Sequence, residues 1–316
     1  MKVVDELLKI MEGSKGESVS GQELAESLGV SRTAVWKAMN KLQEQGYEIE
    51  ATRNRGYRLI KSGDMLSSQR IKEYLPEWAR AEDIQVFKSL GSTNTYAKKL
   101  AADGAKSGTV IIADQQTEGR GRRGNSFFSP PKTGLYMSII LRPDGFDADA
   151  DMVTVCAGCG VCRAIEGLTD KKPMIKWVND IYLKDKKICG ILSEGVTDIE
   201  AGRIDSIVVG IGLNITTDDF PEEIAHKAGA LNQKISRNRI AAEIIGQLFY
   251  CLGRTREENI EEYKSRSLVL GKEVYYLKNG ASHHGEALDI DRNGQLVVLT
   301  RNGREVLNSG EISVRL

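Results

Sequence analysis

The spacing of apolar positions in the first sixty residues predicts two helices followed by a hairpin. Ser20 with Glu23 forms a capping-box pair that opens the first helix, and Gly29 ends it. Ser31 is suited to cap the second helix. After residue 46, apolar residues alternate, turn at RNRG and alternate back, which predicts a hairpin. The apolar positions of these elements are Leu24, Ala25 and Leu28, then Val35, Met39 and Leu42, then Tyr47, Ile49, Ala51, Tyr57 and Leu59.

Two helices joined by a short glycine-containing turn and followed by a hairpin indicate a winged helix-turn-helix. Residues 30–61 hold seven Lys/Arg against three Asp/Glu, an excess of four positive charges that suits phosphate contact. A three-helix module that binds protein is the alternative. The residues expected to contact DNA are Ser31, Arg32, Thr33, Trp36 and Lys37 on the second helix, and Arg53 and Arg55 at the tip of the wing.

The middle of the chain mixes strand-like and helical patterns. Strands joined by hairpins, with helices packed alongside, predict an α+β domain with a mixed sheet. Short alternating runs with Asn-Gly turns at 279–280, 293–294 and 302–303 predict a small β-barrel at the end. We expect domains at 1–64, 65–270 and 271–316. The expected strands are 108–116, 134–143, a pair within 173–196 with a turn at 184–187, and 204–216; the expected helices are 148–169, 237–253 and 257–267.

Composition sets limits on where charge and membranes can matter. The chain has 316 residues, and Lys+Arg equals Asp+Glu at 44 each, so any contact with DNA depends on local charge. The first residues lack the apolar stretch of a signal peptide. No run approaches the ~18–20 apolar residues that span a bilayer. We therefore expect a cytoplasmic protein without a membrane partner.

The histidines and cysteines give weak signals for metal. Cys156, Cys159 and Cys162 have a C-x2-C-x2-C spacing, but the fourth Cys and the Pro of the ferredoxin pattern are missing. They are expected to be buried thiols of an apolar helix. His283 and His284 lie in a Gly-flanked stretch, and we expect both to be surface residues in a turn.

Residues 119–124 read GRGRRG, the spacing of a dinucleotide-binding fingerprint. A strand precedes this loop, but Pro130, Pro131 and another strand follow it, so no helix is available to receive a pyrophosphate. A P-loop needs Gly-Lys-Ser/Thr, whereas Gly124 is followed by Asn125, and the kinase motifs HRD and DFG are absent from the sequence. Arginines on a glycine backbone can pair bidentately with phosphate. Two interpretations remain open: a mobile loop that closes over an anionic ligand, and a basic loop that touches DNA.

Two polar stretches are further candidates for ligand contact. Ser92, Thr93 and Asn94 follow a strand-like run and offer small hydrogen-bonding groups suited to a polar head group. The alternative is that they cap a helix. Lys176 lies in an otherwise apolar strand beside Trp177, either as an edge lysine that reaches solvent or as a cation aimed at an anion.

Five motifs together resemble one family. GSTN (91–94), QTEGRGRRG with FFSP (116–130), KWVNDIYL (176–183), KICGILSE (187–194) and GIGLNI (210–215) stand in the order and approximate spacing of biotin protein ligases. With the winged helix, the chain is similar to the bifunctional type that also represses the biotin operon. The resemblance covers nearly the whole chain. It implies a class II synthetase-like catalytic domain with a mixed sheet, followed by an SH3-like β-barrel.

The resemblance also implies chemistry and partners. Biotin and Mg·ATP would give biotinoyl-5′-adenylate, and a lysine of a biotin carrier protein would then take the biotinoyl group. The adenylate would act as corepressor, with a homodimer binding operator DNA. Lys176 and Arg120 are the expected catalytic residues, and no metal site is expected apart from Mg²⁺ that accompanies ATP. The expected biotin-binding residues are Ser92, Thr93, Asn94, Gln116, Arg120, Gly121, Arg122, Lys176, Gly190 and Ile191, and the expected nucleotide-binding residues are Arg120, Arg122, Arg123, Trp177, Asn179 and Asn214.

The chain departs from the family pattern at three positions. Related sequences often have Arg and Trp where this chain has Asn125 and Phe127, which is expected to loosen the loop's grip on phosphate or its packing on the adenylate. They often have Pro where this chain has Val178, and because Val favours strands we expect this strand to stay intact. Two alternative functions stay open: a ligand-sensing transcription factor with a non-catalytic ligase-like domain, and a lipoate or octanoate transferase.

Overall fold

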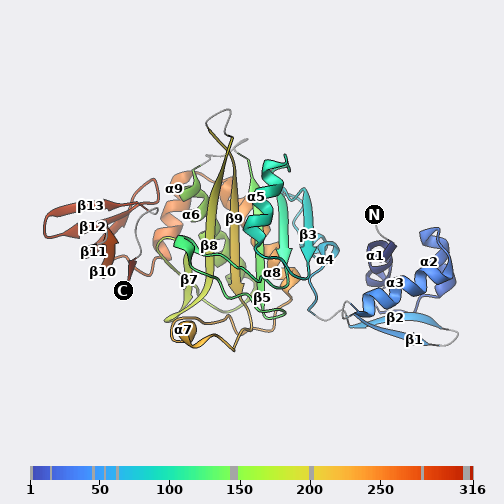
Figure 1. Cartoon of the computed structure of the whole chain (residues 1–316). Coiled ribbons are helices and arrows are strands. Elements are labelled where there is room, and N and C mark those ends of the chain that lie inside the picture. Colours follow the sequence, from blue (N-terminus) through green and yellow to red (C-terminus); the bar gives the residue numbers. More distant parts are fainter. Residues whose placement is uncertain are drawn as a thin grey trace. The chain divides into compact units, whose positions relative to one another are not determined.

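The chain folds into two compact units, Met1–Gln69 and Arg70–Leu316. The computed structural model in Figure 1 describes residues 3–14, 16–44, 47–52, 55–61, 64–142, 149–198, 203–278, 281–308 and 314–315. None of the helices in these ranges is both long and apolar enough to cross a bilayer.

The first unit is a winged helix-turn-helix, as the sequence predicts. Its elements are α1 Val3–Gly13, α2 Gly21–Leu28, α3 Arg32–Glu44, β1 Glu48–Thr52 and β2 Gly56–Lys61. The predicted capping box is present, because Ser20 Oγ accepts from Glu23 N and the Glu23 carboxylate accepts from Ser20 N. Ala34 N donates to Ser31 Oγ at 3.2 Å at the start of α3. Strands β1 and β2 pair antiparallel and form the wing.

The core of this unit confirms most of the predicted apolar positions. Leu28 and Tyr57 are partly buried and pack against it, whereas Ala51 is exposed because it lies next to the tip of the wing. The buried residues include Leu7, Met11, Leu24, Ala25, Val35, Met39, Leu42, Tyr47, Ile49 and Leu59.

A seven-stranded mixed sheet forms the centre of the second unit. Its strands are β3 Asp83–Phe87, β4 Thr109–Ala113, β5 Gly134–Leu141, β6 Met174–Lys176, β7 Asp180–Leu183, β8 Lys186–Asp198 and β9 Arg203–Asn214. The order is β3-β4-β5-β9-β8-β7-β6, with β3 and β4 parallel and the other neighbours antiparallel. Every residue of β5 is buried, so both faces of the sheet are covered. This is the predicted α+β arrangement.

Helices cover the two faces of this sheet. The helices are α4 Ser68–Tyr74, α5 Thr93–Ala102, α6 Ala150–Leu168, α7 Glu222–Ala225, α8 Arg237–Leu252 and α9 Arg256–Ser265. Figure 1 shows α5 in front of the strands and α8 behind them. Ala97 and Ala101 of α5 pack in one cluster with Ile111, Ile140 and Val208 of the sheet. On the other face, α6 and α8 pack against each other (Figure 1).

The segment 173–196 contains three strands, where the sequence predicts two. Lys176 at the end of β6 pairs with Asp180 at the start of β7, so residues 177–179 form the turn between them. The Trp177–Val178 peptide bond is cis. The prediction that Val178 leaves the strand intact is therefore wrong, because the backbone turns here despite the strand propensity of Val. The Val178 carbonyl accepts from the Tyr263 hydroxyl at 2.7 Å.

The C-terminal part is a five-stranded antiparallel sheet of order β13-β12-β11-β10-β14. Its strands are β10 Glu273–Lys278, β11 Ala281–Ile290, β12 Leu296–Thr300, β13 Gly303–Leu307 and β14 Val314–Arg315. The predicted turns at 293–294 and 302–303 are present, and 279–280 lies outside the described residues. His283 and His284 are exposed as predicted, but they lie in β11 and not in a turn.

Candidate functional site

A cavity of about 1060 Å³ is lined by the strands of the central sheet and the loops beside them. All ten residues that the sequence predicts for biotin line it, and so do Arg123, Trp177 and Asn179 of the nucleotide set. Asn214 is not among its lining residues. It is buried at the end of β9, and its Nδ2 donates to Gly229 O at 2.9 Å.

The amide of Asn94 is fixed in one orientation at the polar end of this cavity. Its Nδ2 donates to Leu192 O at 3.1 Å and to Glu194 Oε2 at 2.8 Å. A backbone carbonyl can only accept, so the nitrogen must face Leu192, and both amide hydrogens are used. Asn94 Oδ1 lies 2.6 Å from Ser138 Oγ and above Gly210, where a Cβ would stand only 2.2 Å away. Asn94 lines the cavity, and its Oδ1 keeps a second lone pair that can accept a hydrogen bond from a ligand.

Gln116 offers a hydrogen-bond donor, in contrast to the acceptor on Asn94. Its Oε1 accepts from Thr93 N at 2.8 Å and lies 3.1 Å from Thr93 Oγ1. Its Nε2 donates to Ser129 Oγ at 2.9 Å, which leaves the second N–H for a ligand among the described contacts. Ser92 caps α5 by accepting from Thr95 N at 3.4 Å, so its own O–H can be donated. The helix-cap interpretation is therefore confirmed for Ser92, and its contact with a ligand stays a prediction.

Glycines let an aromatic ring and a cation lie close to the sheet. A Cβ at Gly212 would stand 2.6 Å from the Phe127 ring. A Cβ at Gly190 would stand 3.2 Å from both the Phe127 ring and Lys187 Nζ. Phe127 and Lys187 therefore both lie close to Gly190 in the lining of the cavity.

The arginine loop is held in a tight turn. The η1 turn Arg122–Gly124 is closed by Gly121 N donating to Asn125 O at 2.7 Å and by Asn125 Nδ2 donating to Arg122 O at 2.9 Å. Strand β5 follows it, as the sequence predicts. Asn125, one of the three departures from the family pattern, thus supports the turn through its side chain.

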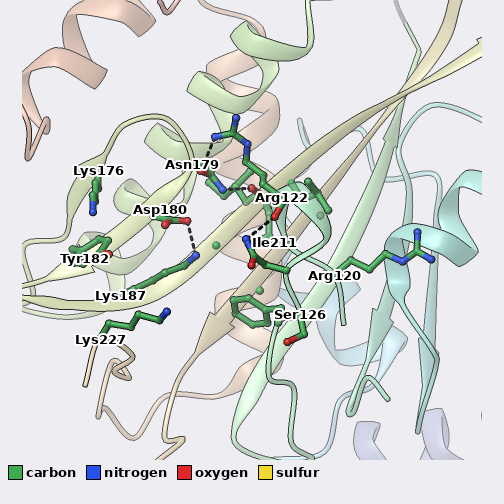
Figure 2. Close-up of a pocket in the computed structure, with 18 of the residues that line it drawn as sticks. Arg120, Arg122, Ser126, Lys176, Asn179, Asp180, Tyr182, Lys187, Ile211 and Lys227 are labelled. Carbon is green, nitrogen blue, oxygen red and sulfur yellow. Dashed lines mark hydrogen bonds and ion pairs between the residues drawn. The ribbon is translucent and has the colours of Figure 1, made fainter. Parts of the chain in front are cut away.

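The arginines of this loop point in different directions. Arg122 is half-buried and donates to Asn179 Oδ1 at 3.3 Å, and burial together with the charge of Arg123 lowers the pKa of Arg122. Figure 2 shows Arg122 turned toward Asn179, whereas Arg120 extends away from Asp180 and Lys187. Arg120 and Arg123 are exposed.

The charged end of the cavity is strongly cationic. Lys176 Nζ lies 5.6 Å from the centre of the Tyr182 ring, and burial raises the pKa of Tyr182 to about 12, so the phenol stays neutral at pH 7. Lys187 Nζ forms an ion pair with Asp180 Oδ1 at 2.6 Å. Only Asp180 and Asp185 among the described lining residues carry carboxylates. The lysines and arginines that line the cavity are Arg120, Arg122, Arg123, Lys176, Lys184, Lys187, Lys227 and Lys272. Such an excess of positive charge is suited to a polyphosphate.

Sequence reasoning missed several residues of this site. Lys187 and Asp180 stand in the motifs that predict the site, but the motifs alone do not single them out as ligand contacts. Lys227 comes from the segment after α7, which no motif marks, and Figure 2 shows it on the same side as Lys187. Ser138 is buried in the middle of β5, where a serine in an apolar strand is the available signal.

The turn after β6 is tied to the C-terminal sheet. The Trp177 side chain lines the cavity and is 4% exposed, and its Nε1 donates to Gly294 O at 2.9 Å. Gly294 has a φ of 77°, which favours glycine, and a Cβ there would stand 3.1 Å from Val155. A residue of the predicted nucleotide site is therefore held by a turn of a different sheet.

The five cysteines are buried free thiols, which confirms the prediction for the C-x2-C-x2-C run in α6. Burial raises the pKa of Cys156 and of Cys162 to about 12, and that of Cys251 to about 11. Burial likewise raises the pKa of the other two thiols. These thiols therefore stay protonated at physiological pH.

The start of α3 presents an exposed polar and aromatic surface on the first unit. Ser31, Arg32, Thr33, Trp36 and Lys37 are all exposed, as is Arg55 in the wing, and Arg53 lies outside the described residues. Trp36 is 54% exposed, an unusual position for a large aromatic side chain. A hollow of about 600 Å³ lies between this helix start and Ala51 and Thr52 of the wing.

These features define a class: a chain with an enzyme-like cavity suited to a small polar ligand and a polyphosphate, which also carries a winged helix-turn-helix. Comparison with known proteins narrows it. Residues 86–214 match the Biotin/lipoate A/B protein ligase family, residues 4–58 an HTH domain, and residues 269–315 the Biotin protein ligase C terminal domain. The chain belongs to the biotin protein ligase family, among its bifunctional ligase/repressor members.

Individual relatives cover almost the whole chain. The chain is 33% identical to the bifunctional ligase/repressor BirA of Bacillus subtilis (strain 168), over 98% of either chain. It is 30% identical to BirA of Escherichia coli (strain K12), over 96% of this chain and 94% of that one. A solved structure of biotin protein ligase from Aquifex aeolicus in complex with biotin and ATP is similar with a TM-score of 0.65 and 29% identity, over 74% of this chain and 99% of that chain.

Proposed function

We propose that this chain is a biotin–protein ligase that forms biotinoyl-5′-AMP from biotin and ATP and passes biotin to a lysine of a carrier protein. The observation that carries the proposal is a single cavity with fixed hydrogen-bonding groups at one end and eight lysines and arginines along its lining. The relatives named for biotin ligation, and the similar structure with biotin and ATP, support it.

The polar end of the cavity suits the ureido ring of biotin. That ring has a carbonyl that accepts hydrogen bonds and N–H groups that donate them. Gln116 Nε2 and the Ser92 hydroxyl would donate to the carbonyl, and Asn94 Oδ1 would accept an N–H. Gly121, Gly190 and Ile191 would line the remaining wall. A lipoyl or octanoyl chain has no groups to satisfy these buried polar atoms, so the inventory favours biotin over the transferase alternative.

The cationic residues would hold the reacting phosphates. Attack of the biotin carboxylate oxygen on the α-phosphorus brings two anions together while the bond to the β-phosphate breaks and pyrophosphate leaves. Lys176, Lys187 and Arg122 would offset this repulsion and stabilise the added charge in the transition state. We infer a contact between Arg120 and the adenylate only after movement of the loop, because Arg120 points elsewhere here. Carboxylates are ionised at pH 7, so the step needs no general base.

ATP would be accompanied by Mg²⁺. Within the described ranges, no group of three or more His, Cys, Asp or Glu side chains is placed to hold a metal ion. Mg²⁺ is commonly held by one or two carboxylates together with substrate phosphates, and Asp180 and Asp185 line the cavity with the right chemistry. Bound there, Mg²⁺ would supply positive charge to the phosphates. Arg123, Trp177 and Asn179 would contact the nucleotide, and Asn214 would act from behind by holding the Gly229 carbonyl.

The transfer step would need the loop again. The lysine nitrogen of the carrier attacks the acyl carbon, the bond from that carbon to the phosphate oxygen breaks, AMP leaves and the nitrogen loses a proton. Water would compete with this lysine for the same carbon. A closed loop 119–124 would exclude it, which is the proposed use of its glycines.

We also propose that the first unit binds operator DNA. Domain 1–64 would place Arg32, Thr33, Trp36 and Lys37 in the major groove, with Arg53 and Arg55 of the wing on the backbone. The adenylate would act as corepressor by favouring a homodimer, which binds two half-sites. The relatives named as ligase and repressor support this second activity.

One experiment separates the ligase from a ligand-sensing transcription factor without catalysis. The full chain is incubated with biotin, Mg·ATP and a biotin carrier domain, and pyrophosphate and biotinylated carrier are measured. The ligase produces both; a chain that binds biotin without producing pyrophosphate is a sensor. In parallel, removal of residues 1–64 is expected to abolish the shift of operator DNA and to leave ligation unchanged. A truncated chain that still shifts the operator would contradict the division of roles.

A further inference from the structure

Glu194 lies behind the proposed biotin site and does not border the space that the ligand would occupy. It is absent from the residues that line the cavity within the described chain. Its two carboxylate oxygens have different partners: Oε2 accepts from Asn94 Nδ2 at 2.8 Å, and Oε1 accepts from Lys98 Nζ at 2.6 Å. One carboxylate thus joins a buried amide of the site to a cation of α5.

This arrangement decides which atom of Asn94 faces the cavity. If the amide turned over, Oδ1 would face the Glu194 carboxylate and the Leu192 carbonyl, which are both acceptors. Its nitrogen would then face the cavity and offer a donor. Since Asn94 is 4% exposed, water cannot readily satisfy the misplaced groups. The Glu194 carboxylate and the Leu192 carbonyl together therefore select the orientation in which Oδ1 stays available as an acceptor.

Lys98 has a different part in this arrangement. The Glu194 and Lys98 side chains are 27% and 31% exposed, so water reaches both ends of their ion pair. An ion pair in such surroundings contributes little on its own. Loss of Lys98 would leave the carboxylate charged and still able to accept from Asn94.

We propose that Glu194 is a positioning residue that sets the polarity of the ligand site by fixing the Asn94 amide, an inference that rests on the proposed biotin ligase function. It acts on recognition of the ligand head group and not on the phosphate chemistry. Its removal should therefore change the KM for biotin and leave the kcat and the KM for ATP nearly unchanged.

The test compares four full-length proteins by pyrophosphate release with biotin and with ATP varied: wild type, Glu194→Gln, Lys98→Met and Glu166→Gln. Gln is isosteric but has a single acceptor for two donors, so Glu194→Gln should raise the KM for biotin about tenfold or more. Lys98→Met should raise it less than about threefold. Glu166 makes a partly buried ion pair with Arg266 away from the cavity, so its variant serves as the matched control.

The outcomes separate the possibilities. A wild-type protein that forms no adenylate would overturn the proposed function itself. With an active wild type, an unchanged KM for biotin in Glu194→Gln would refute the positioning role. Equal losses in Glu194→Gln and Lys98→Met would also refute it, because a merely structural ion pair is broken to the same extent from either side. Thermal melting of each variant, and Glu194→Ala as a second variant, exclude a failure to fold.

Discussion

Replacement of Gly210 by alanine should impair biotin binding from below the site. A Cβ at Gly210 would stand 2.2 Å from Asn94 Oδ1, 2.8 Å from Asn94 Cγ and 3.0 Å from Asn94 Nδ2. Real Cβ atoms do not approach other atoms below 3.0 Å, so something must move. The Asn94 amide cannot move freely, because its nitrogen is bonded to Leu192 O and Glu194 Oε2 and its oxygen to Ser138.

The cost follows from the bonds that must break. Displacement of Asn94 would lose the bond to the charged Glu194 and weaken the bond to Ser138, together about 2–4 kcal/mol of the free energy of unfolding. It would also move the proposed acceptor for the ligand. A loss of about 2 kcal/mol in the free energy of biotin binding raises the KM for biotin about 30-fold. The KM for ATP should change little, since the cationic residues are not displaced.

The assay is pyrophosphate release with biotin varied, together with urea unfolding. Gly195→Ala is the matched control: it lies on the neighbouring strand β8, and its Cβ would stand 3.7 Å from Ile204, an ordinary contact. The control should change the free energy of unfolding by less than about 0.5 kcal/mol. If Gly210→Ala folds and binds biotin with the KM of the control, the fixed orientation of Asn94 is wrong.

Two substitutions and one labelling experiment test other parts of the molecule. Lys187→Met should lower the kcat for adenylate formation about 100-fold, because it removes a cation beside Asp180. Lys184 is exposed, so Lys184→Met should change this kcat less than about threefold. Equal effects of the two substitutions would show that only the total charge of the cavity matters. Trp36→Ala should weaken operator binding in a gel shift at least about tenfold and leave ligation unchanged. Trp78 is an equally exposed tryptophan of the other unit, so Trp78→Ala should leave both operator binding and ligation unchanged. The five cysteines are buried, and their raised pKa values keep them protonated at pH 8. In the folded chain, iodoacetamide should alkylate them at least about 100-fold more slowly than in the chain unfolded by urea, as followed by mass spectrometry. Rapid labelling of any one of them in the folded chain would contradict its burial.

The sequence was sufficient to predict the elements whose pattern is local. Helix caps at Ser20 and Ser31, and the strands 108–116 and 134–143, depend on neighbouring residues, and the structure places them within a few residues of the predictions. The turn at 177–179 was missed because Trp177 and Val178 each favour strands. Pairing of Lys176 with Asp180 imposes the turn there.

The sequence alone also does not show which of two adjacent lysines faces the cavity. Lys186 and Lys187 are adjacent in a strand, so they must point to opposite faces, but the sequence does not say which one faces the cavity. The pairing of β7 with β8 has a register shift between Ile181 and Tyr182. In the folded chain Lys186 bonds to the His226 carbonyl and Lys187 pairs with Asp180 in the cavity. For Glu194 a signal was available, since it has the same strand parity as Gly190 of the predicted site.

The hydrogen bond from the Trp177 indole to the Gly294 carbonyl has a consequence for folding during synthesis on the ribosome. These two residues are 117 positions apart in the chain. At about 5–20 residues per second, the ribosome adds Gly294 some 6–23 seconds after Trp177. During that interval the buried indole N–H of the nascent chain has no access to its acceptor. Trp177 can therefore reach its final place in the proposed nucleotide site only late in synthesis, after both helices α8 and α9 have been made.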